Sequence, residues 1–183
     1  MLRARLVRAG IRFVKKLYVG NLSWSSTDAD LLACETIPSA EEARALARLL
    51  TETPGTHAWF SFSCRDGERI CDGTPIADCV RELASTPRVV AVGVNCTAPV
   101  YISSLVQNIR AATETPIVVY PNLGENWDAD NKVWTGPADP GAFAAAGRGW
   151  RDAGAQLIGG CCRTRPEDIL RLRKTLESLQ KKW

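Results

Sequence analysis

The sequence has few of the residues that mark zinc fingers, secreted proteins or membrane proteins. Its 183 residues include a single histidine, His57, and no two cysteines are spaced as Cys-x-x-Cys, the pair that most structural zinc sites use. No apolar run reaches the ~18 residues that a membrane-spanning helix needs. Residues 1–20 also lack the apolar core and the small-residue cleavage site of a secretory signal. We therefore expect no membrane span and a reducing compartment, in the first instance the cytoplasm.

Acidic side chains are absent from the first 27 residues, which carry six basic ones: Arg3, Arg5, Arg8, Arg12, Lys15 and Lys16. Residues 28–183 then hold 17 basic and 20 acidic side chains, a net charge of −3. A body with this balance lacks the basic face that nucleic acids require, so we expect no nucleic-acid partner. The basic head, residues 1–27, can form an amphipathic helix over 1–18. An organellar targeting segment is the alternative to a solvated or packing helix.

The seven cysteines are an odd number, and in a chain without a secretory signal they argue against a disulfide framework. Reduced cysteines serve either as small buried apolar residues or as thiolate ligands. Which cysteines belong to which class depends on where each one falls in the fold.

Strand-like and helix-like segments alternate along residues 28–183. The expected strands lie at 31–34, 58–64, 89–94, 117–120 and 156–158, and the expected helices begin at Ser39, Pro75, residue 99, Asp139-Pro140 and Thr164-Arg165-Pro166. A polar loop is expected at 123–138, with no antiparallel hairpin between the units. Five βα units predict an α/β fold with a parallel sheet, either doubly wound or a (β/α)₈ barrel.

Capping residues and apolar spacing refine the expected helices. Ser39 with Glu42, and Thr164 with Glu167, have the spacing of capping boxes. The helix at 99–113 is expected to turn inward the side chains of Val100, Leu105, Val106 and Ile109. The last helix has one apolar stripe made of Ile169, Leu172, Leu176 and Leu179.

Both parallel folds gather their chemistry at the carboxyl ends of the strands. The residues expected there are Glu35, Cys64, Asn95-Cys96, Tyr120-Pro121-Asn122 and Cys161-Cys162. If the strand that ends at Cys96 converges with the one before the Cys161-Cys162 pair, three thiolates can bind one zinc ion and leave its fourth position open. Two alternatives stay open, namely that Cys96 is a core residue beside an incidental pair, or that the pair forms a vicinal disulfide.

These strand ends carry a family resemblance. Gly93-Val94-Asn95-Cys96 followed by Gly159-Gly160-Cys161-Cys162 resembles the zinc-binding signature of the homocysteine S-methyltransferases. The segments 31–36, 62–64 and 120–125 resemble the fourth, fifth and seventh strands of that family. The resemblance covers about residues 28–180 and is closest to the enzymes that use S-methylmethionine.

The resemblance implies a (β/α)₈ barrel in which Cys96, Cys161 and Cys162 hold Zn²⁺ and the sulfur of homocysteine is the fourth ligand. It implies that Glu35 binds the substrate's amino group, and that Asn95 and Asn122 line the site. The implied reaction moves a methyl group from a sulfonium donor, S-methylmethionine or S-adenosylmethionine, to the thiol of homocysteine, giving methionine.

The length departs from the family, because such a barrel needs ~250 residues and this chain has 183. The five βα units match family strands four to eight, and no counterpart of the first three units is found. We therefore expect a partial barrel domain over 28–183, whose exposed sheet edges would favour self-association. The alternative function is an inactive, truncated zinc-binding homologue or an interaction fragment.

Overall fold

The computed structural model describes residues 31–128 and 130–177. The helix expected over 1–18, the loop expected over 19–27 and Leu179 of the last apolar stripe lie outside the described residues.

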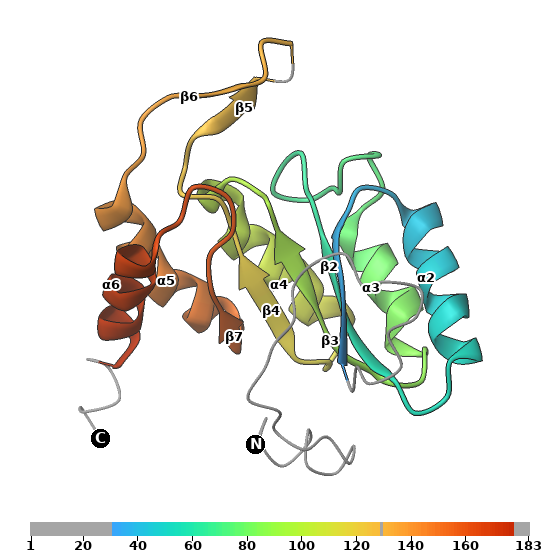
Figure 1. Ribbon diagram of the computed structural model, residues 1–183. Coiled ribbons are helices and arrows are strands. Elements are labelled where there is room, and N and C mark those ends of the chain that lie inside the picture. Colours follow the sequence, from blue (N-terminus) through green and yellow to red (C-terminus); the bar gives the residue numbers. More distant parts are fainter. Residues whose placement is uncertain (1–30, 129, 178–183) are drawn as a thin grey trace.

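Five parallel strands form the central sheet, and helices connect them (Figure 1). The strands of this sheet are β1 (Leu31–Ile37), β2 (His57–Phe62), β3 (Val89–Asn95), β4 (Ile117–Tyr120) and β7 (Leu157–Ile158). The helices are α2 (Ala40–Glu52), α3 (Ile76–Ala84), the 3₁₀ turn η1 (Pro99–Tyr101) leading into α4 (Ile102–Ala112), α5 (Pro140–Ala153) and α6 (Pro166–Glu177). No helix within these described ranges is long and apolar enough to cross a membrane.

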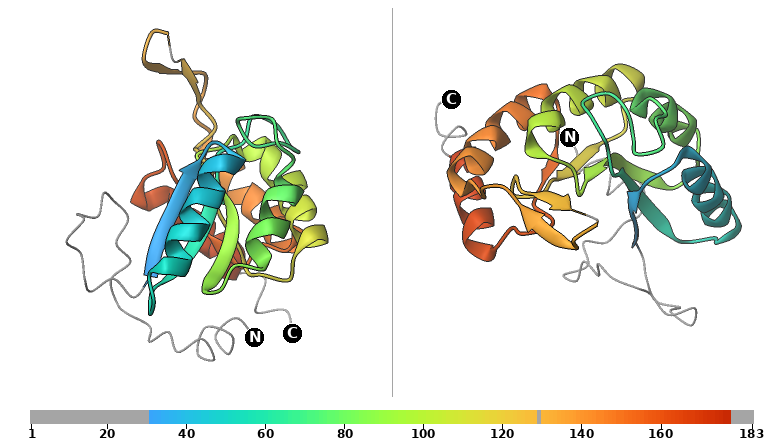
Figure 2. Two further views of the ribbon diagram at one scale, coloured as in Figure 1. Left: turned by 90° about the vertical axis from the view of Figure 1, so that its right-hand side faces the viewer. Right: turned by 90° about the horizontal axis from the view of Figure 1, so that it is seen from above.

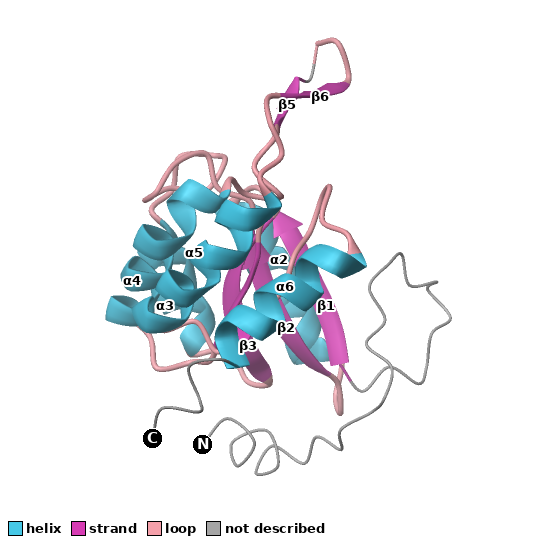
Figure 3. Cartoon of the chain, turned by 90° about the vertical axis from the view of Figure 1, so that its left-hand side faces the viewer, coloured by secondary structure: helices cyan, strands magenta, loops and turns pink. Residues whose placement is uncertain are grey.

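The strand order decides between the two parallel folds. The strands lie in the order β1-β2-β3-β4-β7, each beside the strand that precedes it in this sheet. In a doubly wound sheet the order reverses, so that helices cover both faces. Here the order never reverses, and the helices of the described residues lie on one face (Figure 2). Seen from above, the helices make an outer arc around the strands (Figure 2), and the side view shows them packed along the outside of the sheet (Figure 3). The chain therefore forms part of a (β/α)₈ barrel.

The two faces of the sheet differ in chemistry. On β2, Phe60 and Phe62 are fully buried in the apolar core beneath the helices. The alternate residues Trp59 and Ser61 point to the other, concave face, because side chains alternate along a strand. The concave face corresponds to the interior of a barrel, and it carries the polar groups described below.

Two expected helix starts are confirmed. Ser39 caps α2, since its side chain accepts a hydrogen bond from the backbone N–H of Glu42 at 3.2 Å. Asp139 caps α5 in the same way, accepting from Ala142 at 2.8 Å. Helix α3 begins one residue later than expected, because Pro75 is its N-cap residue and lies outside its first turn.

The capping box expected at Thr164 is wrong. The Thr164 hydroxyl donates to the carbonyl of Cys161 at 2.6 Å, and the side chain of Asp168 accepts from the N–H of Arg165 at 2.9 Å. The hydroxyl is used to close the preceding loop, so Glu167 has no capping partner in it.

Two further expectations are corrected. The loop at 123–138 contains an antiparallel hairpin of β5 (Asn126–Asp128) and β6 (Val133–Thr135), which projects beyond the carboxyl ends of the strands (Figure 1). Trp127 and Trp134 pack across it with ring centroids 5.4 Å apart. Val100 is 79% exposed, because it lies in the 3₁₀ turn η1 and not on the buried face of α4.

Gly93 allows β3 and β4 to pair closely. It is opposite Ser61 of β2 and Val118 of β4 in the sheet. A Cβ atom at this position would overlap the carbonyl oxygen of Val118, which is backbone and cannot move aside without separating the strands.

We predict that Gly93→Ala lowers the free energy of unfolding by roughly 2–3 kcal/mol, because the sheet must open to admit the methyl group. Urea unfolding followed by circular dichroism measures this change. Gly149→Ala is the matched control: its added Cβ would lie 3.5 Å from Ser103 Oγ, an ordinary contact, and in helix α5 it should stabilise the protein by about 0.5–1 kcal/mol. Equal effects of the two substitutions would contradict the argument.

Candidate metal and thiol site

The carboxyl end of β4 lies between the ends of β3 and β7 and hydrogen-bonds to both. On one side the N–H of Cys96 donates to the carbonyl of Tyr120 at 3.3 Å. On the other side the N–H of Cys161 donates to the carbonyl of Pro121 at 2.8 Å. Strand β4 thus lies between Cys96 and Cys161. Their side chains meet beyond the carboxyl end of β4.

The ladder between β4 and the last strand continues beyond the two residues of β7. Gln156 donates to the carbonyl of Ile117 at 3.0 Å, and Gly159 donates to that of Val119 at 2.8 Å. The bond to Cys161 is the next step of the same parallel pattern. The loop that carries the cysteine pair is therefore held in register with β4.

The three cysteine sulfurs form one cluster. Cys96 Sγ lies 2.9 Å from Cys161 Sγ and 3.6 Å from Cys162 Sγ, and all three sulfurs lie within 4.8 Å of one another. All three are free thiols, so the structure contains neither a vicinal disulfide nor a disulfide to Cys96. The convergence expected from the sequence is present.

Local backbone geometry presents these sulfurs. Cys96 has a φ of 47°, in the left-handed region that residues with a Cβ seldom adopt. A Cβ atom on Gly160 would lie 2.6 Å from Thr164 Oγ1. Only glycine therefore fits at position 160, beside the Thr164 side chain. The Gly159-Gly160 sequence thus allows the tight loop that brings the pair toward Cys96.

The thiols of Cys96, Cys161 and Cys162 differ in pKa. The hydrogen bond from Cys96 lowers the pKa of Cys161 to about 6, and a bond from the Asn95 side chain acts in the same direction. The bond to Cys161, together with burial, raises the pKa of Cys96 above its ordinary 9.0. Burial also raises the pKa of Cys162. Of the three thiols, Cys161 is therefore the one whose surroundings favour the thiolate.

Asn95 connects this cluster to Glu35. Its Oδ1 accepts from the N–H of Thr36 at 2.8 Å, and its Nδ2 donates to Thr36 Oγ1 at 2.7 Å. Thr36 has a φ of 58°, and these two bonds hold that left-handed turn directly after Glu35. Since Asn95 is 1% exposed, its amide is a fixed part of the frame.

Asn122 and Glu125 follow β4 and place unpaired acceptors beside the cysteine loop. Leu123 donates its N–H to the carbonyl of Cys162 at 3.2 Å, which ties the two segments together. Asn122 Oδ1 and Glu125 Oε2 are buried without a hydrogen-bond partner in the described part of the chain. Glu125 Oε1 accepts from Arg163 Nε at 2.9 Å, and Arg163 follows Cys162 with a φ of 70°.

The other cysteines do not join the cluster. Cys64, at the end of β2, is buried, and burial raises the pKa of its thiol. Cys34 lies in β1, Cys71 is exposed in a loop, and Cys79 is buried on α3. Cys64 is thus a strand-end cysteine that packs as an apolar residue.

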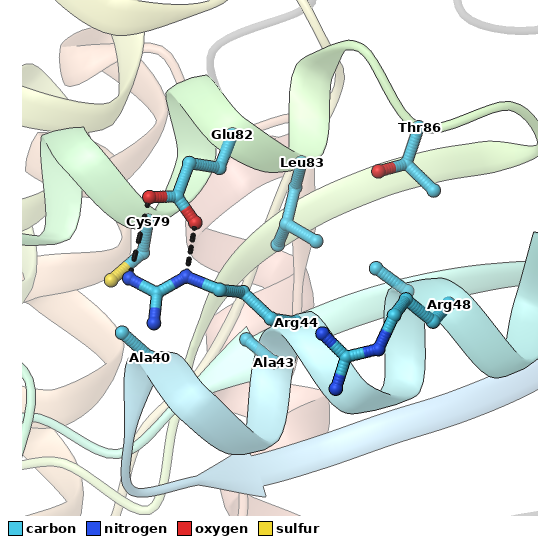
Figure 4. A pocket seen from close by; sticks show the side chains of 9 residues that line it. Ala40, Ala43, Arg44, Arg48, Cys79, Glu82, Leu83 and Thr86 are labelled. Atoms are coloured by element: carbon cyan, nitrogen blue, oxygen red, sulfur yellow. Dashed lines mark hydrogen bonds and ion pairs between the residues drawn. The ribbon is translucent and has the colours of Figure 1, made fainter.

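A separate hollow of about 220 Å³ lies on the outer surface between α2 and α3 (Figure 4). Arg44 and Glu82 close across it in an exposed ion pair of 2.8 Å. None of the three clustered cysteines lines it. The sulfur cluster at the strand ends is therefore the place where the described residues concentrate reactive groups.

The cluster fits a zinc ion by its donor set. Three closely spaced thiols are the soft ligands that zinc prefers, and three protein ligands are the number found in catalytic zinc sites. Cys96, Cys161 and Cys162 are the residues that would hold the ion.

Comparison with known proteins identifies the family. A family model described as homocysteine S-methyltransferase matches residues 12–176. The chain belongs to the homocysteine S-methyltransferase family. The match extends into residues 1–27, and the boundary of the basic head stays a prediction.

Individual relatives agree with the family model. The chain is 49% identical over 152 residues to a homocysteine S-methyltransferase of Bacillus subtilis, with 83% of this chain and 48% of the relative covered. It is 50% identical over 146 residues to the homocysteine S-methyltransferase of Escherichia coli, covering 79% and 47%. A crystal structure of the metallated E. coli homocysteine methyltransferase MmuM matches with a TM-score of 0.68 and 46% identity, covering 80% of this chain and 45% of that one. The chain thus spans about half the length of these family members.

Two contacts of the site escape reasoning from the sequence. Tyr120 is recognised only as the last residue of a strand, although its hydroxyl hydrogen-bonds to Glu35 Oε2 at 3.1 Å. The Glu125–Arg163 ion pair joins residues 38 positions apart. A signal exists only for Tyr120, because a polar aromatic side chain at the end of an apolar strand is unusual in a core.

We predict that Cys161→Ser weakens zinc binding by more than about 100-fold, since a hydroxyl is a poor substitute for a thiolate ligand. Metal content after dialysis and competition with a chromophoric chelator measure the loss. Cys71→Ser, at an exposed loop cysteine, is the matched control and should bind zinc like the unmodified chain. Equal zinc affinity for both variants would remove Cys161 from the ligand set.

We predict that Glu125→Gln weakens zinc binding by about 10-fold, because the ion pair with Arg163 fixes the backbone that follows Cys162. The same competition assay measures it. Glu114→Gln, at a largely exposed glutamate on the loop after α4, is the control. Unchanged affinity in Glu125→Gln would show that the loop keeps its geometry without this ion pair.

Proposed function

We propose that this site transfers a methyl group from a sulfonium donor to the thiol of homocysteine, giving methionine. The observation that carries the proposal is the cluster of three free cysteine sulfurs within 4.8 Å at the ends of β3 and β7. Family membership supports the reaction class, and the metallated form of the E. coli relative supports a metal in this type of protein.

Zinc held by the three cysteines would lower the pKa of a bound thiol and leave one position for the thiol of the substrate. The chain itself contributes the position of the three sulfurs and the lowered pKa of one of them. The hydrogen bond from Cys96 lowers the pKa of Cys161 to about 6, which favours the thiolate that a metal ion binds. The frame around Cys96 and Cys161 is fixed by backbone bonds to Tyr120 and Pro121.

The proposed reaction balances without a redox partner. The homocysteine thiol loses its proton to solvent, and its sulfur forms a bond to the methyl carbon. The bond between that carbon and the sulfonium sulfur breaks, and its electron pair stays on the departing sulfur. A thiolate and a cation become two neutral thioethers, so a partly buried site with little water favours the step over bulk solution.

The remaining proposed contacts come from residues beside the cluster. Glu35 would bind the ammonium group of homocysteine through its carboxylate. Asn122 would line the site, and its buried, unpaired Oδ1 supports this role because such an acceptor is costly until a ligand or water donates to it. Asn95 would act through Thr36, to which its amide is bonded at both atoms, and it helps to lower the pKa of Cys161.

The direct test of the activity uses the full chain loaded with Zn²⁺, incubated with homocysteine and S-methylmethionine. We expect methionine, detected by mass spectrometry, and S-adenosylmethionine in place of S-methylmethionine identifies the preferred donor. Cys161→Ser should form none. Methionine formation at the same rate in both proteins would overturn the proposal.

We predict that Glu35→Gln raises the KM for homocysteine by about 10-fold or more and leaves zinc content unchanged, since the amide removes the charge that pairs with the ammonium group. Steady-state kinetics and metal analysis on the same preparation measure both. Glu52→Gln, at an exposed glutamate that ends α2, is the control. An unchanged KM would contradict the assigned contact.

A second candidate function is a zinc-binding homologue without turnover; the chain spans about half the length of the relatives that it matches. Zinc bound by the three cysteines with no methionine formed would support it.

Strands β1 and β7 are the edges of the described sheet, and we propose that copies of the chain associate through them. Mass in solution tests this, and the seven free thiols suit the cytoplasm as the proposed compartment.

A further inference from the structure

The Tyr120 hydroxyl is the meeting point of a hydrogen-bond network on the concave face of the sheet. Trp59 Nε1 donates to it at 3.1 Å, Ser61 Oγ lies 2.5 Å away, and Glu35 Oε2 lies 3.1 Å away. These four residues come from β1, β2 and β4. The network therefore spans four neighbouring strands, with β3 between β2 and β4.

The direction of every hydrogen in this network follows from chemistry. The Trp59 indole can only donate, so it occupies a lone pair of the Tyr120 oxygen. An ionised Glu35 carboxylate can only accept, so the single hydroxyl hydrogen of Tyr120 points at it. Ser61 must then donate its hydrogen to the remaining lone pair. With both lone pairs used, the Tyr120 hydroxyl has one orientation, and it aims at Glu35.

Burial makes this arrangement rigid. Ser61 is fully buried and Trp59 is 7% exposed, so neither donor has water as a substitute partner. Burial also raises the pKa of the Tyr120 hydroxyl above its ordinary 10.0, so that it stays a donor at physiological pH. In the described part of the chain, Tyr120 is the one residue whose side chain donates to the Glu35 carboxylate.

The sheet is built to let Tyr120 reach across it. Neighbouring strands are about 4.8 Å apart, so a side chain from β4 must pass over β3 to reach β2. Gly93 is the β3 residue opposite Ser61, and it places no side chain in that path.

We propose that Tyr120 is a positioning residue that holds the Glu35 carboxylate in place to receive the ammonium group of the thiol substrate. This inference rests on the proposed function, because it assumes that Glu35 binds that group. One oxygen of Glu35 is fixed by Tyr120, and the rest of the carboxylate stays open on the concave face. A carboxylate that is already oriented loses less freedom when the substrate arrives, which tightens binding.

Two thiols that differ only in the amino group test this directly. They are homocysteine and 4-mercaptobutyrate, the same molecule without its amino group. Each is titrated into the Co²⁺-loaded chain, and the thiolate-to-cobalt absorption reports binding independently of turnover. The measured quantity is the ratio of the two dissociation constants.

We predict that the unmodified chain prefers homocysteine and that Tyr120→Phe lowers this preference by about 5- to 10-fold. Binding of 4-mercaptobutyrate and of Co²⁺ should change by less than about 2-fold, because neither touches the hydroxyl. Tyr101→Phe, at a partly exposed tyrosine in η1, makes the same chemical change elsewhere and should have no effect. In a Glu35→Gln background, Tyr120→Phe should produce no further loss.

Removing the Tyr120 hydroxyl leaves the Ser61 hydroxyl and the Trp59 indole N–H without an acceptor, which can impair folding. The double variant Tyr120→Phe/Ser61→Ala removes one of these unpaired donors. It should show the same loss of preference for homocysteine over 4-mercaptobutyrate in a better-folded chain. If either variant weakens both thiols equally or loses Co²⁺, Tyr120 is merely structural and the inference is wrong.

The outcomes separate this inference from the proposed function. A chain that prefers homocysteine equally with and without the Tyr120 hydroxyl overturns the positioning role and leaves the proposed function standing. An unmodified chain that binds neither thiol, or binds both equally, overturns the proposed contact of Glu35, and the role of Tyr120 fails with it.

Discussion

The carboxyl end of one short strand organises this protein. The carbonyl of Tyr120 accepts from Cys96 on one side, and the carbonyl of Pro121 accepts from Cys161 on the other. Backbone hydrogen bonds in a parallel ladder set the level of each strand against the next. Two cysteines 65 residues apart in the sequence are therefore brought to the same height, and a thiol cluster forms over the strand between them.

The same strand also supports the carboxylate side of the site. The backbone of Tyr120 aligns Cys96, while its side chain reaches across β3 to Trp59 and contacts Glu35. Asn95, which directly precedes Cys96 in the chain, joins the two halves through its two hydrogen bonds to Thr36. The metal ligands and the carboxylate thus belong to one hydrogen-bonded frame.

Backbone strain collects at this frame. Five non-glycine residues have positive φ in the described part of the chain, and three of them, Thr36, Cys96 and Arg163, border the site. Each is held by a specific interaction: Asn95 clamps Thr36, the ladder fixes Cys96, and Glu125 pairs with Arg163. Such conformations persist only where the surroundings stabilise them, and they are common where binding geometry matters.

Much of this architecture can be predicted from local pattern. Alternating apolar runs and capping residues predict the five parallel strands and the start of α2 at Ser39, because these features depend on neighbours in the sequence. The strand-end positions of Cys96 and Cys161-Cys162 predict the thiol cluster, since a parallel sheet brings carboxyl ends together. The errors are also local: Val100 falls in a 3₁₀ turn, the loop at 123–138 folds back as a hairpin, and the Thr164 hydroxyl bonds to Cys161.

The sequence by itself determined the five strands of the central sheet, the helices that connect them, the family and the residues available for chemistry. Only the tertiary structure decided that the strands follow one another without reversal, which makes the sheet part of a barrel. It alone placed the Tyr120 hydroxyl between Trp59, Ser61 and Glu35, and paired Glu125 with Arg163. These contacts depend on strand order, on register and on the direction of each side chain. Those quantities are fixed by the packing of distant segments, so no local pattern in the chain records them.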